Sequence, residues 1–224
     1  MPLSKRIKPQ SVITNQTVFS PLVGTHKTWD EYWALVAPRL KERKEGFKVI
    51  FDYLRSESIY NPHVTIVETG SLREPHNYEG DGNSSYLFDT FIEYHTGEFH
   101  TNDIDPKVCD QAKLHLAHAK VHESDSVKWL HDFDQQVDVL YLDSYNIENW
   151  NHDWPAAAHH LKELLAAYCN LEPGSLLVVD DNVVHPNTKQ KIGKGRLVRE
   201  YIEATECARL IHDGYQEIWQ WSEG

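Results

Sequence analysis

The chain has 224 residues, a formal net charge of -12 and no long low-complexity tract, so its length suits one sizeable domain with a complete core. The acidic balance excludes a general nucleic-acid binder, whose phosphate contacts require clustered Lys and Arg. No apolar run is long enough to span a membrane, and the first ten residues, MPLSKRIKPQ, lack the apolar core of a signal peptide. We therefore expect a cytoplasmic protein that acts on small molecules, with no nucleic-acid or membrane partner.

The first sixty residues are expected to form an arm and two helices. Residues 1–27 are polar and show no sustained period, which predicts an extended N-terminal arm. Thr28 and Glu31 have the spacing of a capping box, and apolar residues at helical spacing continue beyond Pro38. We expect capping helices over residues 28–60, lying at the open edge of the following sheet or over its substrate crevice. Residues 61–224 then form the main domain.

The stretch from His63 to Ser85 organises that domain. Its apolar run Val64–Val67 is typical of a buried parallel strand, and the run ends in Glu68-Thr69-Gly70. Gly70 allows a sharp turn, and the turn at residues 80–84, which includes Asn83 and Ser84, can present N–H groups at the start of the next helix. This arrangement is how an open α/β sheet builds a crevice for an adenosine-bearing ligand.

Four further strands follow, each succeeded by a helix or a loop and helix. They are expected at Phe99–Ile104, Lys120–Glu123, Val137–Leu142 and Leu176–Val179. Repeated strand-helix units predict a parallel sheet with right-handed crossovers. The segments Arg209–His212 and Tyr215–Trp221 flank Asp213-Gly214, a strong hairpin signal. The predicted fold is α/β, a doubly wound and mostly parallel seven-stranded sheet with a C-terminal antiparallel hairpin, in the Rossmann-like manner.

Motifs at the strand ends resemble those of the class I S-adenosylmethionine-dependent methyltransferases over residues 60–222. They are Val67-Glu68-Thr69-Gly70, Asn102-Asp103-Ile104-Asp105-Pro106, Glu123-Ser124-Asp125-Ser126, Val139-Leu140-Tyr141-Leu142-Asp143 and Leu177-Val178-Val179-Asp180-Asp181-Asn182. The resemblance implies a cofactor that lies across the strand tips.

The same resemblance assigns cofactor contacts residue by residue. Those near the methionine part are Glu68, Gly70, Arg73, Asn83 and Ser84, with Arg73 reaching the carboxylate. Asp103 would bind the ribose hydroxyls, since a carboxylate accepts two hydrogen bonds from a diol. Asp125 or Ser126 would meet the adenine, although both also suit the cap of the next short helix.

A metal set is implied by similarity to the catechol and macrolide-sugar O-methyltransferases. It comprises Asp143, Asp181 and Asn182, with Asp180 assigned to the strand end. Three oxygen ligands on neighbouring strand tips suit Mg²⁺, or Mn²⁺, which would lower the pKa of a bound hydroxyl. Polar strand ends without a metal are the alternative.

The sequence departs from the family in two ways: it lacks the lysine base of the catechol enzymes, and its loop between Gly70 and the turn at residues 80–84 is much longer than the usual compact glycine motif. The catechol enzymes carry a lysine base three residues after their first metal aspartate, where this chain has Asn146, so either Asp143 or His185 is the candidate base. The segment Gly193-Lys194-Gly195-Arg196 lacks the context of a phosphate loop, and we expect a flexible basic loop beside the crevice.

The function predicted from the sequence is O-methylation of a small-molecule hydroxyl by S-adenosylmethionine with divalent-metal assistance. One alternative is an NAD(P)-dependent oxidoreductase, in which Gly80-x-Gly82-x-x-Ser85 is a degenerate fingerprint. Another is a non-catalytic binding protein with the methyltransferase fold. The N-terminal arm and helices are expected to serve the acceptor pocket or a homodimer contact.

Overall fold

The computed structural model describes residues 26–80 and 83–222. The predicted N-terminal arm therefore lies outside the described residues, apart from its last two. Among the described residues, no helix is both long and apolar enough to cross a membrane.

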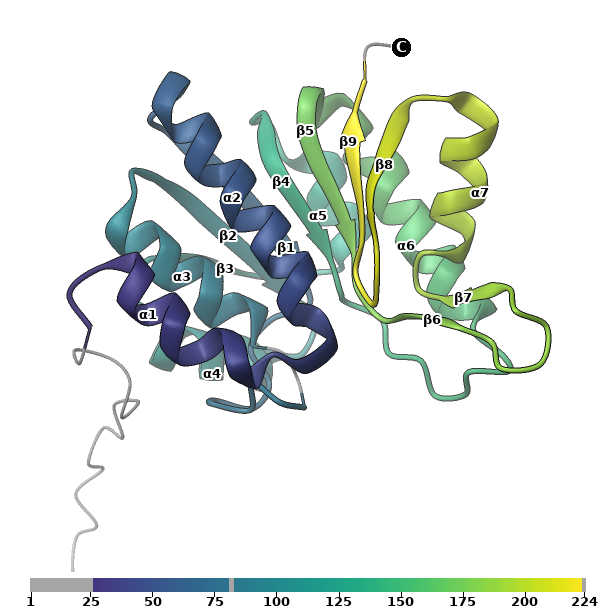
Figure 1. Ribbon diagram of the computed structural model, residues 1–224, viewed down its shortest axis with the longest axis horizontal. Helices are drawn as coiled ribbons and strands as arrows, with labels where there is room; N and C mark the ends of the chain where they lie inside the picture. The colour runs from purple at the N-terminus through teal and green to yellow at the C-terminus, as the bar shows by residue number, and fades with distance from the viewer. Residues whose placement is uncertain (1–25, 81–82, 223–224) are drawn as a thin grey trace, which may run out of the picture.

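The centre of the molecule is a seven-stranded sheet with the strand order β3-β2-β1-β4-β5-β9-β8 (Figure 1). Strands β1 to β5 are parallel, whereas β9 runs antiparallel between β5 and β8. This arrangement confirms the predicted fold class and its terminal hairpin. The strands are β1 (Val64–Thr69), β2 (Gly97–Asp103), β3 (Ala119–Glu123), β4 (Val137–Leu142), β5 (Leu171–Val179), β8 (Ala208–Asp213) and β9 (Glu217–Trp221).

Helices cover both faces of the sheet. The first face carries α1 (Trp29–Val36), α2 (Lys44–Tyr60), α3 (Ser84–Tyr94) and α4 (Pro106–His115), and the second carries α5 (Ser126–Asp132), α6 (Trp154–Ala166) and α7 (Arg196–Thr205). Short 3₁₀ turns cover Ala37–Arg39, Lys41–Arg43 and Tyr168–Asn170.

Alternation along the strands divides the interior into two hydrophobic cores. Ile66 and Tyr141 contribute to the core beneath α1 to α4, while Val67 and Leu142, their chain neighbours, contribute to the core beneath α5 to α7. Successive side chains of a strand point to opposite faces. Because both faces are covered by helices, the central strands β1, β4 and β5 carry apolar side chains toward both faces, as in other parallel sheets.

The order of the strands places the carboxyl ends of β1, β2 and β4 side by side at one edge of the sheet. The order in which the strands are added reverses at β1, which pairs with β2 on one side and with β4 on the other. In this register Thr69 lies opposite Asn102 and opposite Leu142. The residues that follow, Gly70, Asp103 and Asp143, therefore gather at the switch point, where open α/β sheets bind ligands.

The N-terminal helices pack on a face of the sheet and not along its open edge. Thr28 caps α1 by accepting a hydrogen bond from the Glu31 N–H at 3.2 Å. On α2, the ring of Phe47 stacks on Tyr141 of β4 with 5.7 Å between centroids. Figure 1 shows α2 crossing in front of the sheet. Its N-terminal end brings Arg43 to the end of β5, as described below.

Two features of the second half differ from the predicted elements. Strand β5 begins at Leu171, five residues before the expected start, and so contains Pro173 and Gly174. A separate two-stranded hairpin, β6 (Asn182–Val184) with β7 (Lys191–Gly193), follows β5. Its strands have three residues each, too few to show an alternating pattern, and its turn lacks the glycine dipeptides that mark tight hairpins.

The fit between α2 and the sheet can be tested at Phe47, which is fully buried. We expect Phe47→Ala to lower the free energy of unfolding by about 3–5 kcal/mol, through lost burial and the cavity that remains. The matched control is Ile59→Ala on the same helix, whose side chain is 76% exposed and should change stability by no more than about 0.5 kcal/mol. Urea denaturation measures both, and equal losses would contradict the observed packing.

Candidate active site

Two cavities open at the carboxyl ends of β1, β2 and β4. The first, which we call the α3 cavity, has a volume of about 240 Å³ and includes Ser71, Arg73, Asn83, Ser84 and Asp143 in its lining. The second, which we call the α5 cavity, has a volume of about 310 Å³ and includes Asn102, Asp125, Ser126, Tyr145 and His159. Both are lined by Gly70, Asp103, Ile104 and Ser144. The two cavities therefore form adjoining parts of one crevice.

Gly70 lines the crevice without adding a side chain between the ends of β1 and β4. Its φ is +81°, and a Cβ built there would lie 2.6 Å from the carbonyl oxygen of Asp143. Any other residue would combine a strained backbone with a clash between the ends of β1 and β4. Glycine at this position lets a ligand approach both strand ends.

Asp103 stands where the two cavities meet. Its Oδ2 accepts a hydrogen bond from the Ser71 N–H at 3.2 Å, and its Oδ1 accepts one from the Asp105 N–H at 2.9 Å. The cap of α4 is provided by Asp105, which accepts from the Lys107 N–H at 2.9 Å. As expected, the helix cap does not occupy Asp103, and this half-buried carboxylate lines both cavities.

Glu68 lies beneath the crevice and is absent from the lining of both cavities. Its Oε2 accepts hydrogen bonds from the hydroxyls of Ser85 at 2.6 Å and Thr101 at 2.7 Å. Complete burial raises the pKa of the Glu68 carboxyl to about 7. The residue joins β1, β2 and α3, so its observed contacts are structural.

The N-terminal end of α3 faces the α3 cavity. Ser84 and Asn83 line it there, and Arg73 donates a hydrogen bond to Asn146 Oδ1 at 2.6 Å across its rim. Two buried polar atoms, Ser71 Oγ and Asn83 Oδ1, have no hydrogen-bond partner among residues 26–80 and 83–222. A buried donor and acceptor left unpaired are costly, and a polar ligand in this cavity would satisfy them. The residues present thus suit the amino-acid end of S-adenosylmethionine.

In the α5 cavity, Asp125 provides the predicted helix cap, and both Asp125 and Ser126 line the cavity. Asp125 caps α5 by accepting from the Lys128 N–H at 2.9 Å. The Ser126 hydroxyl lies 3.0 Å from His159 Nε2, which in turn lies 3.3 Å from the buried carboxylate of Glu163. Side chains that donate and accept hydrogen bonds are therefore available along this wall.

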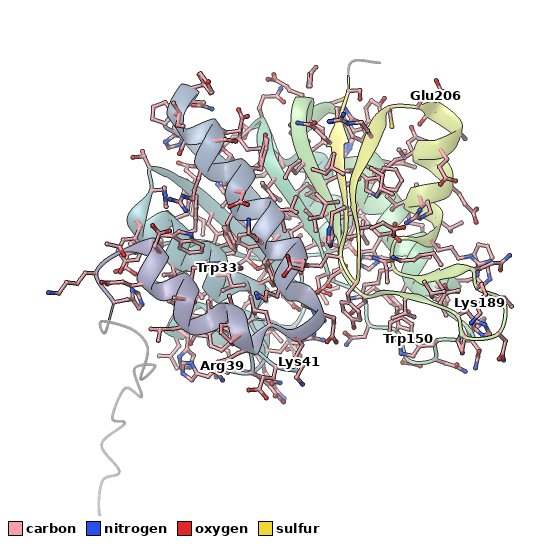
Figure 2. All side chains as sticks on the ribbon, in the orientation of Figure 1. Trp33, Arg39, Lys41, Trp150, Lys189 and Glu206 are labelled. Carbon is pink, nitrogen blue, oxygen red and sulfur yellow. The ribbon has the colours of Figure 1, made fainter. Side chains whose placement is uncertain are left out.

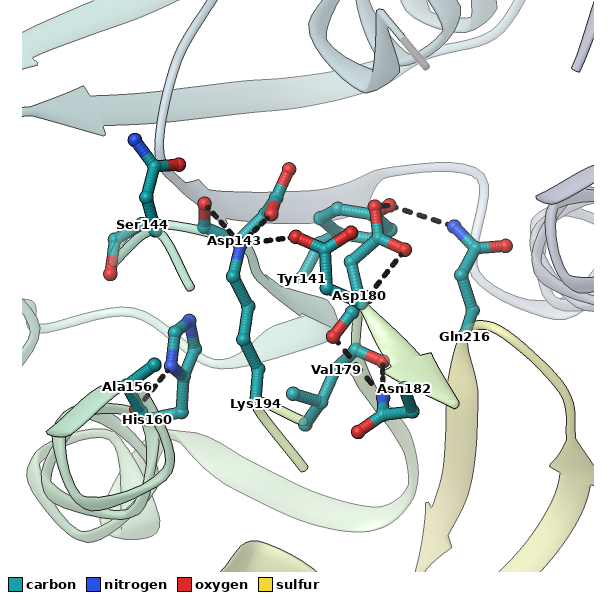
Figure 3. Close-up of polar contacts among 12 residues, drawn as sticks. Tyr141, Asp143, Ser144, Ala156, His160, Val179, Asp180, Asn182, Lys194 and Gln216 are labelled. Carbon is teal, nitrogen blue, oxygen red and sulfur yellow. Dashed lines mark hydrogen bonds and ion pairs between the residues drawn. The ribbon is translucent and has the colours of Figure 1, made fainter. Parts of the chain in front are cut away.

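At the end of β4, Asp143 is paired with a lysine. The Lys194 side chain is fully buried, and its ammonium contacts Asp143 Oδ1 and lies 2.8 Å from Asp181 Oδ2. Figure 3 shows Lys194 extending past His160 to end at Asp143. Although burial opposes the charge, the two carboxylates raise the pKa of Lys194 above its ordinary value. The expected flexible basic loop is wrong at this residue, because its charge lies inside the site.

A second cation enters the same network from the N-terminal helices. Arg43 donates to Asp180 Oδ2 at 2.8 Å and to Asp181 Oδ1 at 3.0 Å. Tyr141 also donates to Asp180 Oδ2, at 2.9 Å, and Tyr215 donates to Asp181 Oδ1 at 2.6 Å. Burial and neighbouring carboxylates raise the pKa of Asp180 to about 7, even though Arg43 opposes that change. Burial also opposes ionisation of Asp181, but Lys194 and Tyr215 hold its pKa at about 2.

The predicted metal set does not fit a divalent ion in this arrangement. Asn182 Nδ2 donates to the carbonyls of Val179 and Asp180, at 2.8 and 3.1 Å, and its Oδ1 accepts from the Gly195 N–H at 2.7 Å. The amide therefore serves the main chain, while the carboxylates of Asp143 and Asp181 are held by Lys194. Within residues 26–80 and 83–222, no group of three or more His, Cys, Asp or Glu side chains is arranged to hold a metal.

His185 is brought to neither cavity. Its Nδ1 accepts from the Asn187 and Thr188 N–H groups at 3.3 and 3.1 Å, and its Nε2 lies 3.4 Å from Asn151 Oδ1. The neighbouring outer loops carry Trp150 and Lys189, near β6 and β7 (Figure 2). Of the two candidate bases, only Asp143 lines the crevice.

Lys194 and Arg43 are the site residues that the sequence did not reveal. They lie 51 and 137 positions away from the aspartates that they bind, and neither belongs to a motif at a strand end. The one available signal for Lys194 was its position between Gly193 and Gly195, which permits a close approach of the backbone.

Comparison with known proteins supports the fold. No protein-family model and no curated protein matches the chain. Among solved structures, MycE methyltransferase from the mycinamycin biosynthetic pathway, in complex with Mg and SAH, is 17% identical with a TM-score of 0.52, over 77% of this chain and 49% of that one. Its complex with Mg, SAH and mycinamycin VI is 15% identical with a TM-score of 0.50, over 77% and 48%. The O-methyltransferase NovP is 13% identical with a TM-score of 0.52, over 85% and 79%.

These similarities establish the architecture. The chain spans about half the length of the MycE structures that it matches. At identities of 13–17%, the likeness shows that the chain has the class I methyltransferase fold.

The close approach at Gly70 predicts a specific cost. Gly70→Ala should destabilise the protein by more than the roughly 1–3 kcal/mol expected for backbone strain alone, because the new Cβ meets the Asp143 carbonyl. Gly174→Ala is the control, since Gly174 also has a positive φ, +103°, but nothing within 4 Å of a built Cβ. Equal losses for the two variants in chemical denaturation would show that the contact between β1 and β4 is unimportant.

The buried Glu68 carboxyl predicts a pH effect. Its folded-state pKa of about 7 exceeds the ordinary value of 4.5, so its contribution to stability is complete below pH 4.5 and is lost as pH rises through 7. Glu68→Gln removes this titration, and the variant should gain stability relative to the wild type between pH 4.5 and 7.5. Denaturation across this range measures the difference. A difference for Glu68→Gln that stays constant across this range would refute the prediction.

Proposed function

We propose that this protein transfers a methyl group from S-adenosylmethionine to a hydroxyl group of a small molecule. The observation that carries the proposal is the crevice formed by the α3 and α5 cavities on a class I methyltransferase fold. Gly70 and Asp103 lie at its midpoint. The cofactor consists of an amino-acid end, a ribose and a base, in that order. The α3 cavity, Asp103 and the α5 cavity offer suitable groups for these three parts in the same order.

The α3 cavity suits the methionine part of the cofactor. Asn83 Oδ1 is a buried acceptor for its ammonium group, and Ser71 Oγ is a buried donor for its carboxylate. Arg73 at the rim and the N-terminal end of α3 add positive charge and a favourable dipole for the same carboxylate. Asp103 would accept hydrogen bonds from the ribose diol, and Asp125 or Ser126 would bind the adenine in the α5 cavity.

S-adenosylmethionine, when bound, supplies an activated methyl group on a sulfonium. Transfer is an in-line displacement, so the protein's contribution is chiefly to orient the acceptor oxygen. Asp143 is the candidate base because its carboxylate lines the α3 cavity. Burial raises its pKa despite the opposing effect of Lys194, which makes the carboxylate a stronger proton acceptor.

A small acceptor is favoured over a nucleic acid by charge. The formal net charge of -12 would repel a phosphate backbone, whose binding requires clustered cations. Arg43 and Lys194, the cations buried behind the crevice, are already neutralised by Asp180, Asp181 and Asp143.

Divalent-metal assistance is not part of the proposal. It was implied by the sequence resemblance, and the MycE structures contain Mg. In the described part of this chain, however, the corresponding aspartates are paired with Lys194 and the asparagine amide serves the main chain. We therefore assign the orientation of the acceptor to protein side chains.

Titration calorimetry with S-adenosylmethionine and with NADH, followed by transfer of labelled methyl groups to a panel of phenols and sugars, tests the function. Binding of the first cofactor and labelled product are expected. NADH binding alone would favour the oxidoreductase, which the antiparallel insertion of β9 beside β5 already argues against. Cofactor binding without transfer to any acceptor, RNA included, would favour a non-catalytic binding protein.

Asp103→Ala should weaken S-adenosylmethionine binding by at least about tenfold. Hydrogen bonds to a charged group contribute about 1.5–3 kcal/mol each, and 1.4 kcal/mol corresponds to a factor of ten in affinity. Calorimetry measures the change. Asp110→Ala, at an exposed position on α4, removes the same charge and should bind normally. Unchanged affinity in folded Asp103→Ala would remove this residue from the cofactor site.

A further inference from the structure

The Lys194 ammonium occupies the position between Asp143 and Asp181 in which a shared cation is needed. A lysine ammonium has three donor protons. The Lys194 ammonium contacts three oxygens at the ends of β4 and β5. They are Asp143 Oδ1, Asp181 Oδ2 at 2.8 Å and the Asp143 carbonyl oxygen at 3.2 Å. The hydrogen-bonding capacity of the ammonium is fully used within the protein.

The backbone at Gly193 and Lys194 is held by hydrogen bonds to neighbouring segments. The Gly193 N–H donates to Asp153 Oδ2 at 2.8 Å, and the Lys194 N–H donates to the Asp181 carbonyl at 3.2 Å. Gly193 has a φ of +124°, and a Cβ there would clash with that same carbonyl. The side chain is 0% exposed. The backbone of Lys194 is thus fixed beside Asp181, and its side chain is enclosed within the site.

The balance of charges at the ends of β4 and β5 argues against a divalent ion between Asp143 and Asp181. Three buried or half-buried carboxylates, Asp143, Asp180 and Asp181, face two cations, Arg43 and Lys194. A metal ion between Asp143 and Asp181 would displace Lys194 and leave an ammonium buried without a partner, which is strongly unfavourable. The protein's own cations thus neutralise most of this cluster.

We infer that the Lys194 ammonium takes the place of a divalent metal ion in this site, so that methyl transfer by this chain is independent of metal. The inference rests on the proposed methyltransferase function for its catalytic part. Lys194 is a positioning residue: it is buried away from the crevice and acts by fixing the carboxylate of Asp143, which lines the α3 cavity. The acceptor oxygen is then oriented by Asp143 and not by a metal ion.

The inference is tested by adding Mn²⁺ to the full-length chain and to Lys194→Ala. Bound Mn²⁺ is counted by the loss of its free electron paramagnetic resonance signal, and stability is measured by thermal denaturation. The wild type should bind no Mn²⁺ at millimolar concentrations, and a chelator should leave its methyl transfer unchanged. Lys194→Ala leaves two facing carboxylates and an empty space, so it should bind one Mn²⁺ per chain and gain several degrees in melting temperature.

Lys191→Ala is the matched control. Lys191 lies three positions earlier and pairs with Asp213 and Glu217, away from the crevice, so its loss should create no Mn²⁺ response. Mn²⁺ should also restore part of the methyl transfer that Lys194→Ala loses, an effect that a merely structural lysine would not produce. If Lys194→Ala does not fold, Lys194→Gln provides the same test with a larger side chain.

Two results would overturn the inference. One is stoichiometric Mn²⁺ binding by the wild type that is lost in Asp181→Asn. The other is a folded Lys194 variant that shows no Mn²⁺ response. Failure of the proposed function is distinguishable, because it appears as an absence of S-adenosylmethionine binding in calorimetry, whereas the Mn²⁺ titration is read without cofactor or acceptor.

Discussion

The ends of β4 and β5 depend on a set of buried ion pairs. Asp143, Asp180 and Asp181 lie close enough to repel one another, and each is desolvated. Such carboxylates are tolerated only when cations and hydrogen-bond donors reach them. Arg43 and Lys194 do so from opposite ends of the chain. The N-terminal helices and the segment after β7 are therefore joined through the strand tips that form the crevice.

The sheet was predictable because its information is local. Val137–Leu142 is apolar on every residue but one and stands between polar turns, so its length and composition indicate a buried strand. The Asp213-Gly214 turn indicated the hairpin of β8 and β9 for similar reasons. The early start of β5 escaped prediction because Pro173 and Gly174 ordinarily interrupt strands. The sequence shows neither the pairing of Leu171 with Val137 nor the short ladder of β6 and β7.

The residues that line the crevice were more predictable from the sequence than the ion pairs at the ends of β4 and β5. Gly70 and Asp143 each directly follow a strand and Asp103 ends one, and parallel strands bring such residues to one edge. Lys194 and Arg43 reach the same edge through tertiary packing, so no spacing in the sequence connects them with the aspartates. For Asn182 the sequence motif indicated a metal ligand. In the structure, however, its Oδ1 accepts a hydrogen bond from the Gly195 N–H, and the sequence did not reveal that contact.

Asp143 and Asn182 show how polar side chains at neighbouring strand tips serve different purposes in this structure. The aspartate faces the α3 cavity, whereas the asparagine holds the turn that delivers Lys194. Because Asn182 Oδ1 accepts a hydrogen bond from the Gly195 N–H, this asparagine supports the turn that carries Lys194 instead of offering its oxygen to a metal ion. Because a lysine carries one positive charge and a divalent ion carries two, this exchange leaves Asp143 less neutralised. The carboxylate then keeps more of its capacity to accept a proton, which a metal-bound carboxylate largely loses.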